Sequence, residues 1–195
     1  YLYTTMDNFE VSATIKNDEV YLGFGTVDTA QKINNKIYYI PKTAKYADYI
    51  KKLYEIDYNN STTKNINVTS WQELKNAIEN NAIEVNINNN RCTLKKIVIN
   101  LKNGGDWTAN STIEISSLQQ VVLISSEKIK ITRGNFINEL YDRGRITHEN
   151  PLFYVKGNLS IGNGNMTGTI TIDGNKANIT AKSALIKVEG GTFNL

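Results

Sequence analysis

The stretch LFYVKGNLSIG at residues 152–162 decides the expected fold, because two short apolar runs flank a Gly157-Asn158 corner. TITI at residues 169–172 follows as a third short run, and Asp173-Gly174-Asn175 ends it. Glycine and asparagine tolerate the positive φ angles that tight corners often need. The pattern predicts strands of three to five residues that are separated by sharp polar turns.

Similar short runs recur over residues 83–195, and we group them into four sets. The first runs of the sets begin at residues 83, 121, 152 and 185, so the spacings are 38, 31 and 33 residues. Such a period is typical of a solenoid, in which no single turn buries its own core. The sets are 83–87, 97–101 and 112–115; 121–124 and 129–132; 152–155, 159–161 and 169–172; and 185–188 and 192–195.

A helix is predicted just before the first of these runs. Ser70-Trp71-Gln72-Glu73 is a capping box, in which Ser70 accepts the N–H of Glu73 and the Glu73 carboxylate returns to the N–H of Ser70. Trp71 and Leu74 begin an apolar stripe, and Asn80-Asn81 ends the helix. We expect Trp71 and Leu74 to cover the open end of the solenoid, because exposed strand edges aggregate unless they are capped.

Residues 1–64 differ in composition and are predicted to form a separate small α+β unit. Nine of the eleven tyrosines lie in the first 58 residues, and a polar run at residues 59–64 reads as the boundary with a second domain, 65–195. Residues 9–15 and 20–24 predict a hairpin, residues 36–40 a third strand, and residues 44–54 a short helix.

Residues 66–195 resemble a known family. VTSWQELKNAI at residues 68–78, followed by IEVNI, resembles the amphipathic cap of bacterial right-handed parallel β-helix proteins of the pectate-lyase-like superfamily. Residues 121–132 and 152–195 are similar to its adhesin-like surface branch. The resemblance implies a mainly β fold: the start of a right-handed parallel β-helix with an N-terminal capping helix. It also implies a secreted or cell-wall-attached protein, although the same scaffold hosts lyases, hydrolases and adhesins.

Lyases and hydrolases on this scaffold need paired acids, or acids with Ca²⁺ and a base, on adjacent turns. Acidic residues are sparse here, and Asp173 reads as a turn-forming residue. A Ca²⁺ site through Asp173 and Asn175 would have only two ligands, so neither a metal nor a cofactor is expected. The acids considered are Glu84, Asp106, Glu114, Glu127, Asp173 and Glu189.

The densest charge lies in a long corner at residues 133–151, where binding sites tend to sit. The candidate binding residues there are Tyr141, Arg143, Arg145, His148 and Glu149. One interpretation is a loop that contacts a ligand or partner, with His148 and Glu149 as a conceivable acid/base pair. The other is a solvated hairpin with internal ion pairs, since a lone histidine among charges lacks an orienting partner and a nucleophile.

Composition narrows the function classes. The net charge of +3 comes from 22 basic and 19 acidic residues without a basic stripe, so nucleic acid is not an expected partner. No apolar window is long enough for a transmembrane helix. The lone Cys92 is either a buried small apolar residue or a free thiol. Both ends of the chain read as cut from a longer polypeptide.

The hypothesis favoured by the sequence is a non-catalytic cell-surface adhesin or structural stalk that binds a host protein, a matrix protein or a glycan. The alternative is a carbohydrate-active enzyme of the same fold whose catalytic turns lie beyond residue 195.

Overall fold

The computed structural model describes residues 10–16, 19–25, 36–40, 50–51, 54–80, 83–88, 91–142, 145–162, 164, 166–179 and 183–195. At residues 10–16, 19–25, 36–40, 87–88 and 141–142 the description is of the backbone alone. The chain divides into two compact units, one of Tyr1–Thr62 with Ala82–Lys95 and one of Thr63–Asn81 with Lys96–Leu195. Residues 82–95, which the sequence prediction assigned to the second domain, therefore belong with the first unit.

The first unit contains a six-stranded sheet with the order β1-β2-β3-β6-β7-β4. β1 and β2 pair antiparallel with Lys16 opposite Glu19, and the predicted third strand is present, so both expectations are confirmed. The predicted helix at residues 44–54 lies mostly outside the described residues. The strands are β1 (Glu10–Lys16), β2 (Glu19–Gly25), β3 (Lys36–Ile40), β4 (Glu55–Asp57), β6 (Ile83–Asn88) and β7 (Arg91–Leu94).

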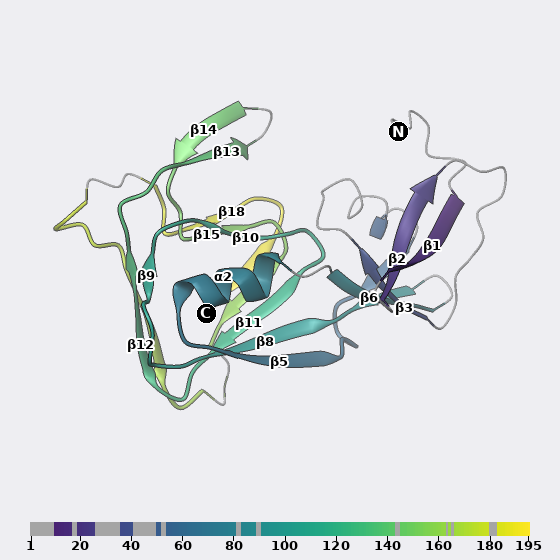
Figure 1. Ribbon diagram of the computed structural model, residues 1–195, viewed down its shortest axis with the longest axis horizontal. Coiled ribbons are helices and arrows are strands. Elements are labelled where there is room, and N and C mark those ends of the chain that lie inside the picture. The colour runs from purple at the N-terminus through teal and green to yellow at the C-terminus, as the bar shows by residue number, and fades with distance from the viewer. Residues whose placement is uncertain are drawn as a thin grey trace. The chain divides into compact units, whose positions relative to one another are not determined.

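The second unit is built around three sheets in which every pairing is parallel (Figure 1). The five-stranded sheet consists of β5 (Thr63–Val68), β8 (Lys96–Leu101), β11 (Gln120–Ile124), β16 (Asn158–Ile161) and β19 (Thr192–Asn194). The second sheet consists of β9 (Thr108–Ala109), β12 (Lys128–Arg133) and β17 (Thr169–Asp173). The third consists of β10 (Ile113–Ile115), β15 (Phe153–Val155) and β18 (Ile186–Val188).

From β8 onward the chain visits the three sheets in a constant order, and we call one such passage a circuit. β8, β9 and β10 form the first circuit, β11, β12 and β15 the second, and β16, β17 and β18 the third. β19 then returns to the five-stranded sheet beside β16. The fold is thus mainly β, with parallel strands stacked from one circuit to the next.

The predicted phase of the repeat is wrong in two respects. Residues 83–87 were expected to open the first set, but β6 pairs antiparallel with β3 and β7 in the first unit. Residues 152–155 were expected to stack on residues 121–124, but β15 stacks on β10. The expected stacking of residues 185–188 on residues 152–155 is confirmed, since β18 pairs with β15. Short apolar strands of similar length can stack against any of several equivalent strands. The strand that each one pairs with therefore depends on the length and path of the chain between them.

The stacked strands align apolar side chains into one core. Val121 lies between Ile97 and Leu159 in the five-stranded sheet, and Phe193 continues that row. In the third sheet Ile113, Phe153 and Ile186 occupy equivalent positions. Burying such rows removes apolar area from water and stabilises the fold by roughly 25 cal/mol per Å².

Helix α2 (Trp71–Glu79) covers one end of this core, and Figure 1 shows it over the space that the three sheets surround. Its Trp71, Leu74 and Ile78 side chains are buried in the same core cluster as the sheet residues, as predicted for a cap. Within the described residues, no helix is long and apolar enough to cross a membrane.

The capping box is only half confirmed. The Ser70 side chain accepts the N–H of Glu73 at 3.2 Å, and Asn80 is the C-cap, both as predicted. The Glu73 carboxylate, however, accepts the N–H and hydroxyl of Thr69, at 2.7 and 3.0 Å, in place of the Ser70 N–H. Thr69, the residue before the N-cap, is therefore the hydrogen-bond partner of the Glu73 carboxylate.

Candidate functional site

The charged corner at residues 133–151 contains an antiparallel hairpin. It consists of β13 (Asn138–Asp142) and β14 (Arg145–Glu149), inserted between β12 and β15 of the second circuit. Strand alternation gives the hairpin two faces: Leu140 and Thr147 are half-buried, whereas Glu139 and His148 are exposed.

Among the predicted binding residues whose side chains the structure describes, His148 and Glu149 make separate contacts. His148 lies directly opposite Glu139, and its Nε2 atom is 3.3 Å from Glu139 Oε1. Glu149 instead reaches Lys187, with 2.8 Å between Oε1 and Nζ. An acid/base pair of His148 with Glu149 is therefore wrong, because neighbouring residues of a strand point to opposite faces.

The contact of His148 with Glu139 lies within the hairpin, as the alternative interpretation of a solvated hairpin expected, whereas the ion pair of Glu149 joins the hairpin to Lys187 of β18. Arg145 is exposed on β14. Arg143 lies outside the described residues, and Tyr141 is described only through its backbone, which pairs with Ile146.

A cleft of about 430 Å³ lies at the base of the hairpin, and the sequence did not predict it. One side is formed by α2, another by the start of β10 and the residues before it, and a third by β13. Tyr154 of β15 also lines it. Its residues are Lys75, Glu79, Ser111, Thr112, Glu114, Asn138, Glu139, Leu140 and Tyr154.

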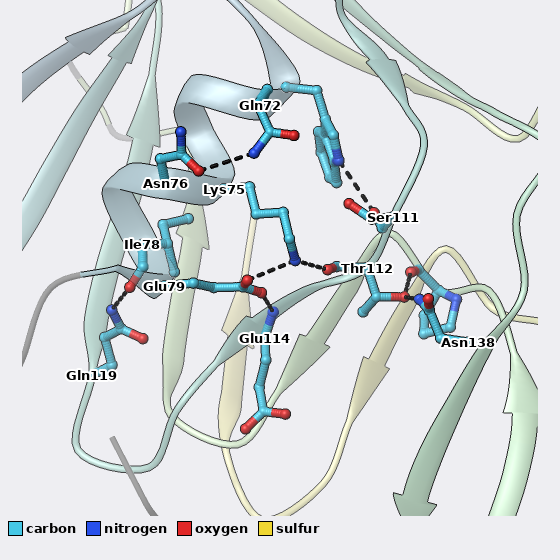
Figure 2. A network of polar contacts seen from close by, with 12 residues as sticks. Gln72, Lys75, Asn76, Ile78, Glu79, Ser111, Thr112, Glu114, Gln119 and Asn138 are labelled. Atoms are coloured by element: carbon cyan, nitrogen blue, oxygen red, sulfur yellow. Dashed lines mark hydrogen bonds and ion pairs between the residues drawn. The ribbon is translucent and has the colours of Figure 1, made fainter. Parts of the chain in front are cut away.

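The helix side of the cleft is held by polar contacts that Figure 2 shows. The Lys75 ammonium donates to the Thr112 carbonyl at 2.7 Å and forms an ion pair with Glu79 at 2.6 Å. Glu79 also accepts the backbone N–H of Glu114 at 2.8 Å. One i,i+4 pair on α2 is thereby coupled to the backbone of β10.

The hairpin side is attached to the same strand through Thr112. The Thr112 hydroxyl donates to the Pro151 carbonyl at 2.6 Å and accepts from the Asn138 amide at 2.6 Å (Figure 2). Thr112 is buried, so these contacts are shielded from water. Both ends of the hairpin are therefore connected to the start of β10.

Lysines on the outer face of the third sheet surround Tyr154. Glu114, Tyr154 and Lys187 are partners in the parallel register, and Tyr154 is 1% exposed. Lys156 Nζ lies 4.7 Å from the Tyr154 ring centroid and 3.4 Å from Glu114 Oε1, while Lys187 Nζ lies 5.8 Å from the ring. Cation–π contacts of this kind favour the buried ring position.

Comparisons with known proteins add no assignment. No family model, curated protein or solved structure matches this chain.

Five of the acids considered as catalytic candidates form hydrogen bonds or ion pairs, whereas one carboxylate oxygen of Glu189 is buried without a hydrogen-bond partner. Asp173 forms an ion pair with Lys130 at 2.7 Å and accepts the N–H of Asn175, and the Lys130 contact lowers the pKa of its carboxyl. Asp173 is therefore the turn-forming residue that the sequence predicted. Among the described residues, no group of three or more His, Cys, Asp or Glu side chains is placed to hold a metal ion.

Arg133 has a different role from the rest of the charged corner. It is 3% exposed, and its guanidinium donates to the carbonyls of Ser183 and Ala184 at 3.1 and 3.0 Å. Burial lowers the pKa of this group. Arg133 thus attaches the segment before β18 to the core and does not contribute to an exposed binding surface.

The cleft combines charged, amide and hydroxyl groups on a rigid support. Its residues come from segments near positions 75, 112, 139 and 154, which no local pattern connects. The only sequence signal is the Lys75–Glu79 spacing, which is typical of an exposed helix pair. Such an arrangement can bind a polar ligand by hydrogen bonds and charge.

Proposed function

We propose that this chain is a non-catalytic adhesion or stalk module of a bacterial surface protein, built on the start of a right-handed parallel β-helix. The repeated circuit of three parallel sheets supports the fold, since it allows strands to stack as a rigid rod. Under this proposal, the ligand is a glycan or a host or matrix protein.

The observation that carries the proposal is the hairpin inserted into an otherwise repeating path. An insertion on a rigid scaffold is where binding residues commonly lie. Arg145 and Ile146 of β14 are both exposed, on opposite faces of the hairpin, and Ile146 is 63% exposed although it is apolar. Ile137, just before β13, is 71% exposed. Exposed apolar residues beside charges suit a surface that meets a partner.

Glycan and matrix-protein arrays test the proposal. The 195-residue chain should bind a defined subset of ligands, and Arg145→Ala with Ile146→Ser should weaken the binding. Arg91→Ala, which changes an exposed arginine of the first unit, is the matched control and should leave binding unchanged. An array without any specific binding would contradict the proposal.

The enzymatic alternative is tested separately by uronate release from pectin and alginate, with and without Ca²⁺. We expect no turnover. Clear product formation by this chain would replace the adhesion proposal with the carbohydrate-active one.

A further inference from the structure

We infer that Asn103 is a modification site, at which the folded chain converts the asparagine into isoaspartate with water as the only co-reactant. Asn103 is followed by Gly104. A backbone nitrogen reaches the amide of the preceding asparagine most readily when it belongs to glycine, because glycine has no Cβ atom to obstruct the approach. The chain has a second such pair at residues 163–164, of which Asn163 lies outside the described residues. The modification needs no ligand, so it is independent of the proposed function.

The reacting groups are open to water and are not held by other groups. Asn103 and Gly104 are exposed in the corner between β8 and β9. Gly104 has a φ of +123°, and nothing lies within 4 Å of the position that a Cβ atom would take. Among the described residues, no hydrogen bond involves the Asn103 side-chain amide, the Asn103 carbonyl or the Gly104 N–H. Neither the nucleophile nor the carbon that it attacks is therefore restrained by a partner.

The reaction balances with water alone. The Gly104 nitrogen forms a bond with the Asn103 Cγ atom, the bond between Cγ and Nδ2 breaks, and ammonia leaves with the proton of the Gly104 N–H. Water then opens the resulting succinimide ring at one of its two carbonyl groups. Opening at Cγ gives aspartate, whereas opening at the main-chain carbonyl gives isoaspartate, in which the main chain runs through Cβ.

The pair Asp173-Gly174 has the same spacing but is held in place. One carboxylate oxygen of Asp173 lies 2.7 Å from Lys130 Nζ, and the other accepts the N–H of Asn175 at 2.8 Å. An ionised carboxylate with both oxygens engaged is a poor target for the Gly174 nitrogen. The structure therefore distinguishes Asn103 from Asp173, although both residues precede a glycine in the sequence.

The modification alters contacts between neighbouring corners. The Asn103 N–H donates to Glu127 Oε2 at 2.7 Å, and Glu127 Oε1 lies 3.5 Å from Lys102 Nζ. Isoaspartate places a new carboxylate on the Cα atom of residue 103, beside the N–H that binds Glu127. Like charges at this distance repel, so the contact weakens. The additional main-chain atom also displaces Gly105, whose backbone lies close to the Thr69 carbonyl.

The experiment follows the conversion in the full chain. The chain is incubated at mildly alkaline pH, once folded and once in urea, and the peptides that contain Asn103 and Asp173 are analysed by mass spectrometry with electron-transfer fragmentation, which distinguishes isoaspartate from aspartate. A site that opens at almost no free-energy cost is hardly protected, so the rate at Asn103 in the folded chain should lie within about threefold of the rate in urea. Asp173 should be protected several-fold by folding.

Two variants assign the product and its effect. Asn103→Gln should form no isoaspartate at position 103, because its longer side chain would have to close a larger ring. Asn65→Gln, at an exposed asparagine of β5 that precedes isoleucine, is the matched control and should leave the rate at Asn103 unchanged. The converted parent chain should melt about 2–4 °C below the fresh chain. Asn103→Gln, which retains Asn163, should keep its melting temperature after the same incubation.

A rate at Asn103 that falls by more than about threefold on folding would overturn the inference. Equal decreases in melting temperature for the incubated parent and the incubated Asn103→Gln chain would overturn the assigned effect on the corner. Neither result bears on the adhesion proposal, which the arrays test separately.

Discussion

The Trp71 ring meets the Phe153 ring edge-on, with 5.3 Å between the ring centroids and 63° between the ring planes. Both side chains are buried, and the indole N–H of Trp71 donates to the Ser111 carbonyl at 3.2 Å. The first residue of the helix α2 is thus packed on a strand of the second circuit. The cap is part of the core and does not merely lie over it.

Trp71→Ala should therefore lower the free energy of unfolding by about 3–5 kcal/mol, because it removes a buried ring and leaves a cavity. Trp71→Phe should cost less, since it keeps an aromatic contact with Phe153. Urea unfolding followed by circular dichroism measures both. Gln72→Ala on the exposed side of the same helix should stay within about 0.5 kcal/mol of the parent, and equal losses at positions 71 and 72 would contradict the assigned cap.

Gly157→Ala should destabilise the chain by at least about 2 kcal/mol, as overpacking against backbone does. A Cβ atom at position 157 would overlap the carbonyl oxygen of Ser116 and lie 2.5 Å from that of Gln119. At Gly164 nothing lies within 4 Å of such an atom, so Gly164→Ala is the matched control and should be tolerated. Thermal unfolding gives the melting temperatures of the two variants. Similar values would show that close stacking at the Gly157 corner is not needed.

Asp173→Asn should reduce stability at pH 7 but not in strong acid. The contact with Lys130 holds the pKa of Asp173 below its ordinary value of 3.8 in the folded chain. A lowered folded pKa gives stability that is present above pH 3.8 and is lost as the pH falls through the folded value. The melting temperature of Asp173→Asn should thus approach that of the parent below pH 3.8.

Lys130→Gln should reproduce the loss at pH 7, because it removes the main cause of the shift. Lys128→Gln, an exposed lysine on the same strand, serves as the control. A decrease in melting temperature for Asp173→Asn that is the same at pH 7 and at about pH 2.5 would contradict the assigned linkage.

Cys92 should resist thiol reagents until the first unit unfolds. It is fully buried in β7, and burial raises the pKa of its thiol to about 12. The reactive thiolate is therefore scarce at pH 8, and a reagent also has no access to it. Cys92 is the only cysteine of the chain. The amount of thiol that reacts with a coloured disulfide reagent at each urea concentration therefore measures the unfolding of this unit alone. Rapid labelling without urea would show that the site is open.

Sequence patterns predicted the local elements well. The hairpin of β1 with β2, the strand β3, the N-cap at Ser70 and the C-cap at Asn80 depend on residues close together in the chain. Asp173 could be recognised as a turn former for the same reason, since it bonds to Asn175 two residues later. A hairpin in the charged corner at residues 133–151 was also one of the two interpretations that the sequence offered.

The cleft could not be predicted, because its contacts join distant segments. Lys75 reaches a carbonyl 37 residues later, and Asn138 reaches a hydroxyl 26 residues earlier. A similar limit explains why His148 was considered with its chain neighbour Glu149. In the structure it is paired with Glu139, which only the register of the hairpin brings opposite.

The sequence by itself determined that this chain forms short strands, sharp corners and a capped helix, because alternation, glycine placement and capping act over a few residues. Only the tertiary structure decided which strands stack, since Ile83–Asn88 is as apolar as the strands of the circuits and still pairs with Lys36–Ile40. Strands of similar length and hydrophobicity are interchangeable locally. Their partners are selected by the packing of the whole unit, and the cleft exists only once that packing is complete.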